Sequence, residues 1–124
     1  MDWEVYKLKE SGGRTAPFVS IGRGTLDFSG SACALINDNG QYKYAQILKG
    51  KDRGKAVVAV KFLEEYMENS IPIKRKKQNG KVISGMTIRN KEAISTLFGK
   101  DGTNDGMVRH KVELIQENIL RIVE

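Results

Sequence analysis

Residues 74–81 read KRKKQNGK, and the Asn79-Gly80 pair within them constrains the fold more strongly than any other feature of the sequence. A two-residue turn of type I′ needs positive φ at both central positions, and Asn-Gly adopts this conformation readily. We therefore predict a β-hairpin with strands over 71–77 and 81–88. Its register places Gln78 opposite Lys81, Lys77 opposite Val82, Lys76 opposite Ile83 and Arg75 opposite Ser84.

The first strand of this hairpin carries four consecutive cations. Because side chains alternate between the two faces of a strand, both faces are charged, and such a strand cannot lie on a core. The upper half of the hairpin must therefore project from the domain as an arm. Its lysines either deter edge-to-edge aggregation or contact a polyanion. We favour polyanion contact, with these residues as candidates: Lys74, Arg75, Lys76, Lys77 and Lys81.

A second basic cluster, KGKDRGK, covers residues 49–55. We expect it to be a loop that connects a strand over 42–48 with a strand over 55–63. Its two glycines expose backbone N–H groups, which suits a phosphate, although a lysine-rich loop is also an ordinary solvated feature. The candidate contacts in this loop are Lys49, Lys51, Arg53 and Lys55.

The composition is that of one ordinary globular domain over residues 1–124, with 40% apolar and 29% charged residues. Lys plus Arg number 21 against 15 Asp plus Glu, so the net charge is +6, which favours polyanionic partners. The first ten residues carry charges throughout, and the longest apolar run is 56–60. Neither a secretory signal nor a membrane span is indicated, and we expect a cytoplasmic location.

The order strand, strand, helix, strand, strand occurs twice, over 17–63 and 71–124. Ser29 is placed to cap a helix over 30–36, and Asn90 to cap a helix that Gly99 ends. Setting residues 26–36 over 88–98 aligns Leu26 with Ile88. The predicted fold class is α+β: a β-rich single domain of two similar ββαββ halves with two short helices.

Residues that support catalysis or metal binding are few. Cys33 is the only cysteine and His110 the only histidine, so neither a disulfide framework nor a cysteine-rich zinc site is available. Residues 101–106 match the start of a calcium loop, but Val112 stands where a bidentate Glu is needed. We therefore predict no enzyme activity, no catalytic residues, no metal and no cofactor.

Residues 19–28 read VSIGRGTLDF and precede a short helix with Ala32 and Leu35, then strands over 42–48 and 57–62. This order resembles the swapped-hairpin pattern of the SpoVT/AbrB transition-state regulators, in which two strands joined by a glycine turn precede a helix and two further strands. It is also similar to small uncharacterised bacterial and phage-borne proteins. The resemblance implies a basic, β-rich homodimer of the regulator or accessory-protein kind.

Together these features predict a non-enzymatic basic protein that binds a phosphate-bearing polyanion, most of all nucleic acid, mainly through the 74–81 arm. The alternative is a phage or mobile-element accessory or anti-defence protein that binds a nucleotide messenger or a host protein. Many potential edge strands and the family resemblance both favour a homodimer.

Overall fold

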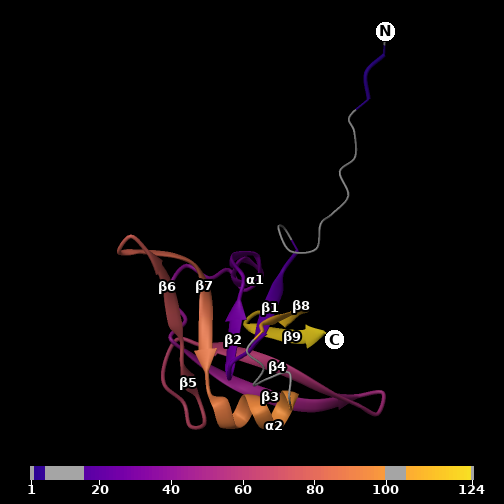
Figure 1. Ribbon diagram of the computed structural model, residues 1–124, viewed down its shortest axis with the longest axis vertical. Helices are drawn as coiled ribbons and strands as arrows, with labels where there is room; N and C mark the ends of the chain where they lie inside the picture. The colour runs from indigo at the N-terminus through magenta and orange to yellow at the C-terminus, as the bar shows by residue number, and fades with distance from the viewer. Residues whose placement is uncertain (1, 5–15, 100–105, 124) are drawn as a thin grey trace.

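The computed structural model of the protein describes residues 2–4, 16–99 and 106–123 (Figure 1). Within these residues, nine strands form one antiparallel sheet, accompanied by two short helices. The elements in chain order are β1 (Phe18–Gly22), β2 (Thr25–Phe28), α1 (Gly30–Leu35), β3 (Tyr44–Asp52), β4 (Lys55–Leu63), β5 (Ile71–Pro72), β6 (Lys74–Gln78), β7 (Lys81–Arg89), α2 (Lys91–Phe98), β8 (Val108–Gln116) and β9 (Ile119–Val123).

The sheet is nearly closed on itself. Its strand order is β5-β3-β4-β9-β8-β1-β2-β7-β6, so the two outermost strands, β5 and β6, are consecutive in the chain. Ile71 in β5 pairs with Ala45 in β3, the amide of Ile73 donates to the carbonyl of Lys43 at 2.8 Å, and Lys74 in β6 pairs with Thr87 in β7. One continuous segment therefore joins the two edges of the sheet.

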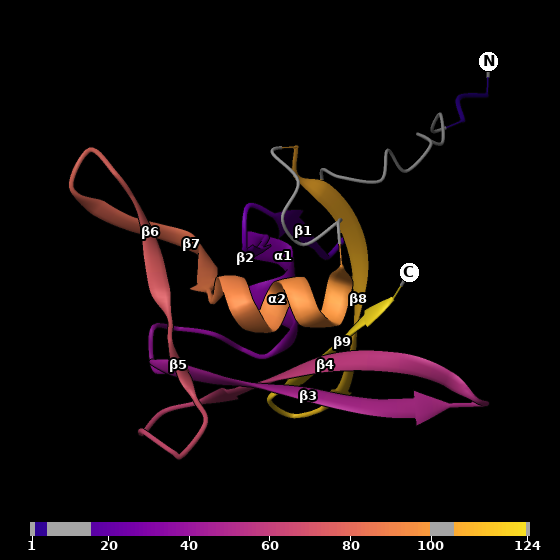
Figure 2. The ribbon, with the colours of Figure 1, turned by 60° about the horizontal axis from the view of Figure 1, so that its bottom comes forward.

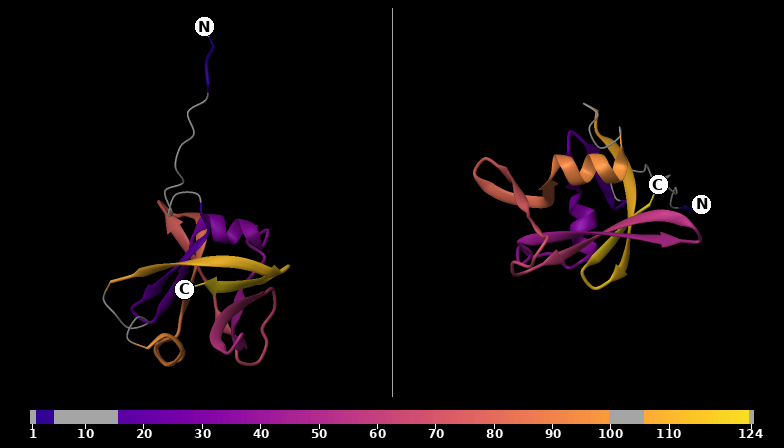
Figure 3. Two further views of the ribbon diagram at one scale, coloured as in Figure 1. Left: turned by 90° about the vertical axis from the view of Figure 1, so that its right-hand side faces the viewer. Right: turned by 90° about the horizontal axis from the view of Figure 1, so that it is seen from below.

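Apolar side chains from most of the strands fill the interior of this sheet. The rings of Phe28 and Phe62 meet edge to face, with centroids 5.2 Å apart, and Tyr42 packs beside Phe62. Val60 and Leu120 are fully buried nearby. The two helices lie at opposite ends of the sheet, α1 at its upper end and α2 below it in Figure 1, and the left panel of Figure 3 agrees. The result is a β-rich single domain with one core.

Both helices begin where the sequence predicts. The hydroxyl of Ser29 accepts a hydrogen bond from the amide of Ala32 at 3.1 Å, and the side-chain oxygen of Asn90 accepts one from Ala93 at 3.0 Å. Each cap satisfies a backbone donor that the helix itself leaves unpaired. Gly99 ends α2 with a φ of 60°, which confirms its predicted role as the terminator.

The hairpins of the first part of the chain pair with strands of the second part rather than with each other. β1 pairs with β8, β2 with β7, β3 with β5 and β4 with β9. In the β2–β7 pair Leu26 lies opposite Ile88, and in the β4–β9 pair Ala59 lies opposite Arg121. In both of these residue pairs the two partners are 62 positions apart in the sequence.

The predicted loop over 49–55 is wrong, because this segment is the tip of a hairpin. β3 continues through Asp52, which lies opposite Lys55, and only Arg53 and Gly54 form the turn. Both turn residues have positive φ, 52° and 82°, as a type I′ turn requires. The Arg-Gly pair therefore acts here as Asn-Gly does at 79–80, where the φ angles are 53° and 80°.

The predicted register of the β6–β7 hairpin holds only near its turn. Gln78 lies opposite Lys81 and Lys77 opposite Val82, as predicted. Arg75, however, lies opposite Met86 instead of Ser84, because the register shifts between Arg75 and Lys77 and β7 contributes extra residues there. Such a bulge bends a hairpin and increases its twist.

Candidate polyanion-binding surface

Two basic hairpins project from the domain, and they point away from each other. Figure 2 shows the β3–β4 hairpin extending to the right and the β6–β7 hairpin to the upper left, and the right panel of Figure 3 agrees. We call residues 49–55 the β3–β4 tip and residues 74–81 the β6–β7 tip. The nine candidate contacts predicted from the sequence therefore fall into two separate groups.

The β3–β4 tip presents its four cations to solvent: Lys49, Lys51, Arg53 and Lys55 are all exposed. Lys49 lies opposite Val58 and Lys51 opposite Ala56, so these two lysines share one face of the hairpin. Lys55 lies opposite Asp52 and faces the other way. The tip thus carries positive charge on both faces as well as at its turn.

The one acid in the β3–β4 tip is already paired. A carboxylate oxygen of Asp52 lies 2.9 Å from a guanidinium nitrogen of Arg121, which reaches it from β9. The Asp52 side chain is 48% exposed and that of Arg121 is 32% exposed, so this is a pair at the surface. Because Arg121 offsets the negative charge of Asp52, the positive charge of the four tip cations is not reduced by that acid.

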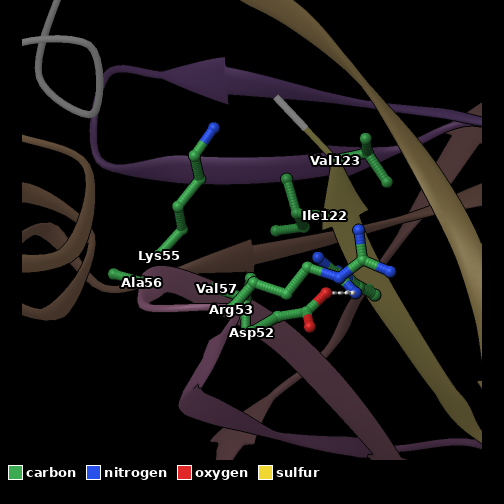
Figure 4. A pocket seen from close by; sticks show the side chains of 8 residues that line it. Asp52, Arg53, Lys55, Ala56, Val57, Ile122 and Val123 are labelled. Carbon is green, nitrogen blue, oxygen red and sulfur yellow. Dashed lines mark ion pairs between the residues drawn. The ribbon is translucent and has the colours of Figure 1, made fainter.

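A pocket of about 310 Å³ lies between the β3–β4 tip and the end of β9 (Figure 4). Three cationic side chains and one carboxylate border it, and apolar side chains form the rest of the wall. The lining residues are Asp52, Arg53, Lys55, Ala56, Val57, Arg121, Ile122 and Val123. Nε of Arg121 is buried and has no hydrogen-bond partner among the described residues. The pocket therefore combines excess positive charge with a buried guanidinium donor that no described residue satisfies.

On the other face, an open groove of about 490 Å³ separates the β3–β4 hairpin from α2. Lys49 and Lys51 border it, while Val58 and Leu97 contribute apolar surface. A neighbouring cavity, lined in part by Ile47 and Ala93, also contains Lys49 and Leu97, so the two hollows adjoin.

The β6–β7 tip offers fewer cations than the sequence predicts. Lys74 and Lys77 are exposed, and the side chains of Lys76 and Lys81 lie outside what the structure describes. Arg75 turns back to Asp38: both terminal guanidinium nitrogens contact the carboxylate, one of them at 2.9 Å, and that nitrogen also donates to the carbonyl of Tyr42 at 2.6 Å. Arg75 is therefore engaged within the domain.

Sequence reasoning missed Arg121 and the role of Asp38. Arg121 is the single polar residue of β9, which reads ILRIV, and from the sequence it looks like any solvated side chain. Its approach to Asp52 depends on the pairing of β4 with β9, which joins the two parts of the chain. No local pattern marks either ion pair.

In residues 2–4, 16–99 and 106–123, no group of three or more His, Cys, Asp or Glu side chains is placed to hold a metal ion. Cys33 is buried in α1. Of the predicted incomplete calcium loop over 101–106, residues 101–105 lie outside the described part of the chain. Neither described helix is long and apolar enough to cross a membrane.

Comparison with known proteins adds no relative: no protein-family model, no curated protein and no solved structure matches this chain.

Proposed function

We propose that the protein is a non-enzymatic binding protein for a phosphate-bearing polyanion, most of all nucleic acid. The observation that carries the proposal is the β3–β4 tip, where four exposed cations surround a single acid that Arg121 already pairs. Neutralising phosphates with lysine and arginine releases the counterions condensed on a nucleic acid, and this release drives binding.

The β6–β7 tip stays in the proposal through Lys74, Lys77, Lys76 and Lys81. We rank it second because Arg75 is held by Asp38 and is not available to a ligand without breaking that pair. Lysines contact phosphate as point charges and do not distinguish bases, so we expect both tips to position the protein on nucleic acid without strong sequence preference.

We also propose that the domain consists of two related ββαββ halves in a swapped-hairpin arrangement. Two facts support this idea. Hairpins of one half pair with strands of the other half, and the partners in Leu26–Ile88 and in Ala59–Arg121 are the same number of positions apart in the sequence. The proposal extends to a cytoplasmic homodimer of the regulator or accessory kind. Leu114 and Ile115, both exposed on β8, are available for such a dimer contact, and light scattering measures the mass directly.

Fluorescence anisotropy with labelled duplex DNA and labelled RNA tests the proposed function. A variant with Lys49, Lys51, Arg53 and Lys55 all changed to alanine removes the charge of the β3–β4 tip. We expect it to fold normally, because exposed tip residues bury little surface, and to lose at least about a hundredfold in affinity at low salt.

The matched control changes Lys43 and Lys111 to alanine, since both are exposed and lie outside the two tips. We expect its affinity to stay close to that of the parent. A third variant, Lys74→Ala with Lys77→Ala, ranks the tips: a larger loss than in the quadruple variant makes the β6–β7 tip the main contact. If the parent binds neither DNA nor RNA at low salt, the proposed function is wrong.

A second candidate function is the binding of a nucleotide messenger by a phage or mobile-element accessory protein. The pocket beside Arg121 favours it, because a small nucleotide requires a concave cationic site rather than an exposed ribbon. Saturable binding of one nucleotide per pocket distinguishes it from polyanion binding, which depends steeply on salt.

A further inference from the structure

We infer that the pocket between the β3–β4 tip and β9 binds a terminal phosphate group, carried either by a free mononucleotide or by the end of a nucleic acid. This inference deepens the proposed function, since it gives one site on the polyanion-binding surface a defined ligand. It concerns a phosphomonoester, whereas the exposed tips serve the phosphodiesters along the chain.

The charge of the pocket fits a phosphomonoester. Arg53, Lys55 and Arg121 supply three positive charges against the one negative charge of Asp52, which leaves an excess of two. A phosphomonoester carries about −1.5 to −2 at neutral pH. An internal phosphodiester carries about half of that, so it leaves part of the pocket charge unbalanced.

Arg121 is suited to be the main ligand of this phosphate. It lies in β9 between β4 and β8, opposite Ala59 on one side and Glu113 on the other, so its backbone is held by two neighbouring strands. Asp52 engages one terminal nitrogen of its guanidinium, and Nε has no partner among the described residues. A planar guanidinium binds a phosphate through two parallel hydrogen bonds, and for Arg121 these come from its terminal nitrogens, because Nε is buried.

Asp52 acts as a competitor in this arrangement. When no ligand is present, its carboxylate pairs with the guanidinium of Arg121. When a phosphate enters, the two anions share one guanidinium, and the carboxylate weakens binding through like-charge repulsion. Removing the charge of Asp52 should therefore strengthen phosphate binding, which a purely structural ion pair does not predict.

The remaining walls limit the size of the ligand. Val57, Ile122 and Val123 offer apolar surface for a sugar or base beside the phosphate. A volume of about 310 Å³ lies at the lower end of small-molecule sites, which run from about 300 to 1,000 Å³. The pocket thus has room for one nucleotide unit and not for a longer stretch of chain.

Isothermal titration calorimetry with the intact protein tests the inference in two arms. In the first arm AMP is compared with adenosine, and in the second a 5′-phosphorylated oligonucleotide is compared with the same sequence bearing a 5′-hydroxyl. We expect AMP to bind and adenosine not to bind. If the physiological ligand is a nucleic-acid end, the phosphorylated oligonucleotide also binds about tenfold more tightly than its partner. If only AMP shows the preference, the source is a free nucleotide.

Variants assign the binding to the pocket. Arg121→Gln should weaken AMP at least about tenfold, Lys55→Gln should weaken it less, and Asp52→Asn should strengthen it roughly fivefold. Arg89→Gln is the charge-matched control, because Arg89 is exposed at the end of β7 outside the pocket, and it should leave AMP binding unchanged. Lys55 lies at an exposed tip, so its variant remains informative if Arg121→Gln does not fold.

Equal binding of AMP and adenosine, or unchanged AMP binding in both the Arg121 and the Lys55 variants, overturns the inference. This failure differs from failure of the proposed function. If the parent protein binds DNA without any preference for a terminal phosphate, only the inference about the pocket is wrong. If it binds AMP and no nucleic acid, only the proposed polyanion binding is wrong.

Discussion

Arg75 and Asp38 form an ion pair that ties the start of the β6–β7 hairpin to the segment between α1 and β3. Two guanidinium nitrogens meet the two carboxylate oxygens, and one of them also donates to the carbonyl of Tyr42. The two side chains are only 18% and 8% exposed. An arginine inside a run of four cations therefore stabilises the fold, while Lys74 and Lys77 of the same run are exposed.

Changing Arg75 to alanine should lower the free energy of unfolding by about 3 kcal/mol, because it leaves the mostly buried carboxylate of Asp38 without its partner. Asp38→Ala should cost a similar amount. Urea denaturation of both single variants and the double variant measures the coupling between the two residues, which we expect to exceed about 1 kcal/mol. The control is Lys74→Ala, one position earlier and exposed, which should change stability by less than about 0.5 kcal/mol. Equal effects at positions 74 and 75 would contradict this account.

Two strand glycines should respond differently to alanine. A Cβ at Gly22 would lie 2.8 Å from the carbonyl oxygen of Gly106 and 2.9 Å from the sulfur of Met107, and a backbone oxygen cannot move away cheaply. At Gly50 the nearest atom is a methyl of Val57 at 3.8 Å, an ordinary contact. We expect Gly22→Ala to lower the melting temperature by several degrees, at a cost of about 1–3 kcal/mol, and Gly50→Ala to leave it nearly unchanged. A loss of stability at Gly50 as large as that at Gly22 would show this reasoning to be wrong.

Tyr42 should make stability depend on pH in the alkaline range. Burial raises the pKa of its phenol above the ordinary value of 10.0, and the nearby carboxylates of Glu117, Glu64 and Asp38 add to the rise. The unfolded chain therefore loses this proton at lower pH than the folded protein, so stability falls as pH increases past about 10. Denaturation of Tyr42→Phe and of the parent at several pH values should show a smaller decline in the variant. If the stability of both proteins falls equally with rising pH, Tyr42 is not the source of the pH dependence.

The salt dependence of DNA binding should report how many cations of the β3–β4 tip contact phosphate. If Lys49, Lys51, Arg53 and Lys55 all do so, log affinity falls against log salt with a slope of about −4 for duplex DNA. Replacing Lys49 and Lys51 with alanine should reduce the magnitude of the slope by about 2, and replacing Lys43 and Lys111 should leave it unchanged. Binding that does not vary with salt would exclude the phosphate contacts.

Much of the fold follows from local sequence signals. Asn79-Gly80 marks its turn, Ser29 and Asn90 cap their helices, and the register next to the turn is as predicted. In each case the decisive interaction spans only a few residues, so a single chemical preference decides the outcome.

The candidate site was less predictable because it depends on distant pairings. Arg75 finds Asp38 only after the segment that carries both β5 and β6 has joined the edges of the sheet. Arg121 reaches Asp52 only because β9 lies beside β4. The turn at Arg53-Gly54 was missed for another reason: a dipeptide flanked by cations resembles a solvated loop, and neither β3 nor β4 carries an apolar alternation that continues to the turn.

The pairing of early hairpins with late strands has a consequence for how the chain is made on the ribosome. β1–β2 and β3–β4 emerge first, yet neither pairs with the other, and their partners in β7, β8 and β9 do not yet exist. Isolated two-stranded hairpins are marginally stable in water, and pairings between distant strands form slowly. We expect the nascent first half to stay open, with its apolar faces uncovered, until the last strands arrive and the whole sheet assembles in one cooperative step.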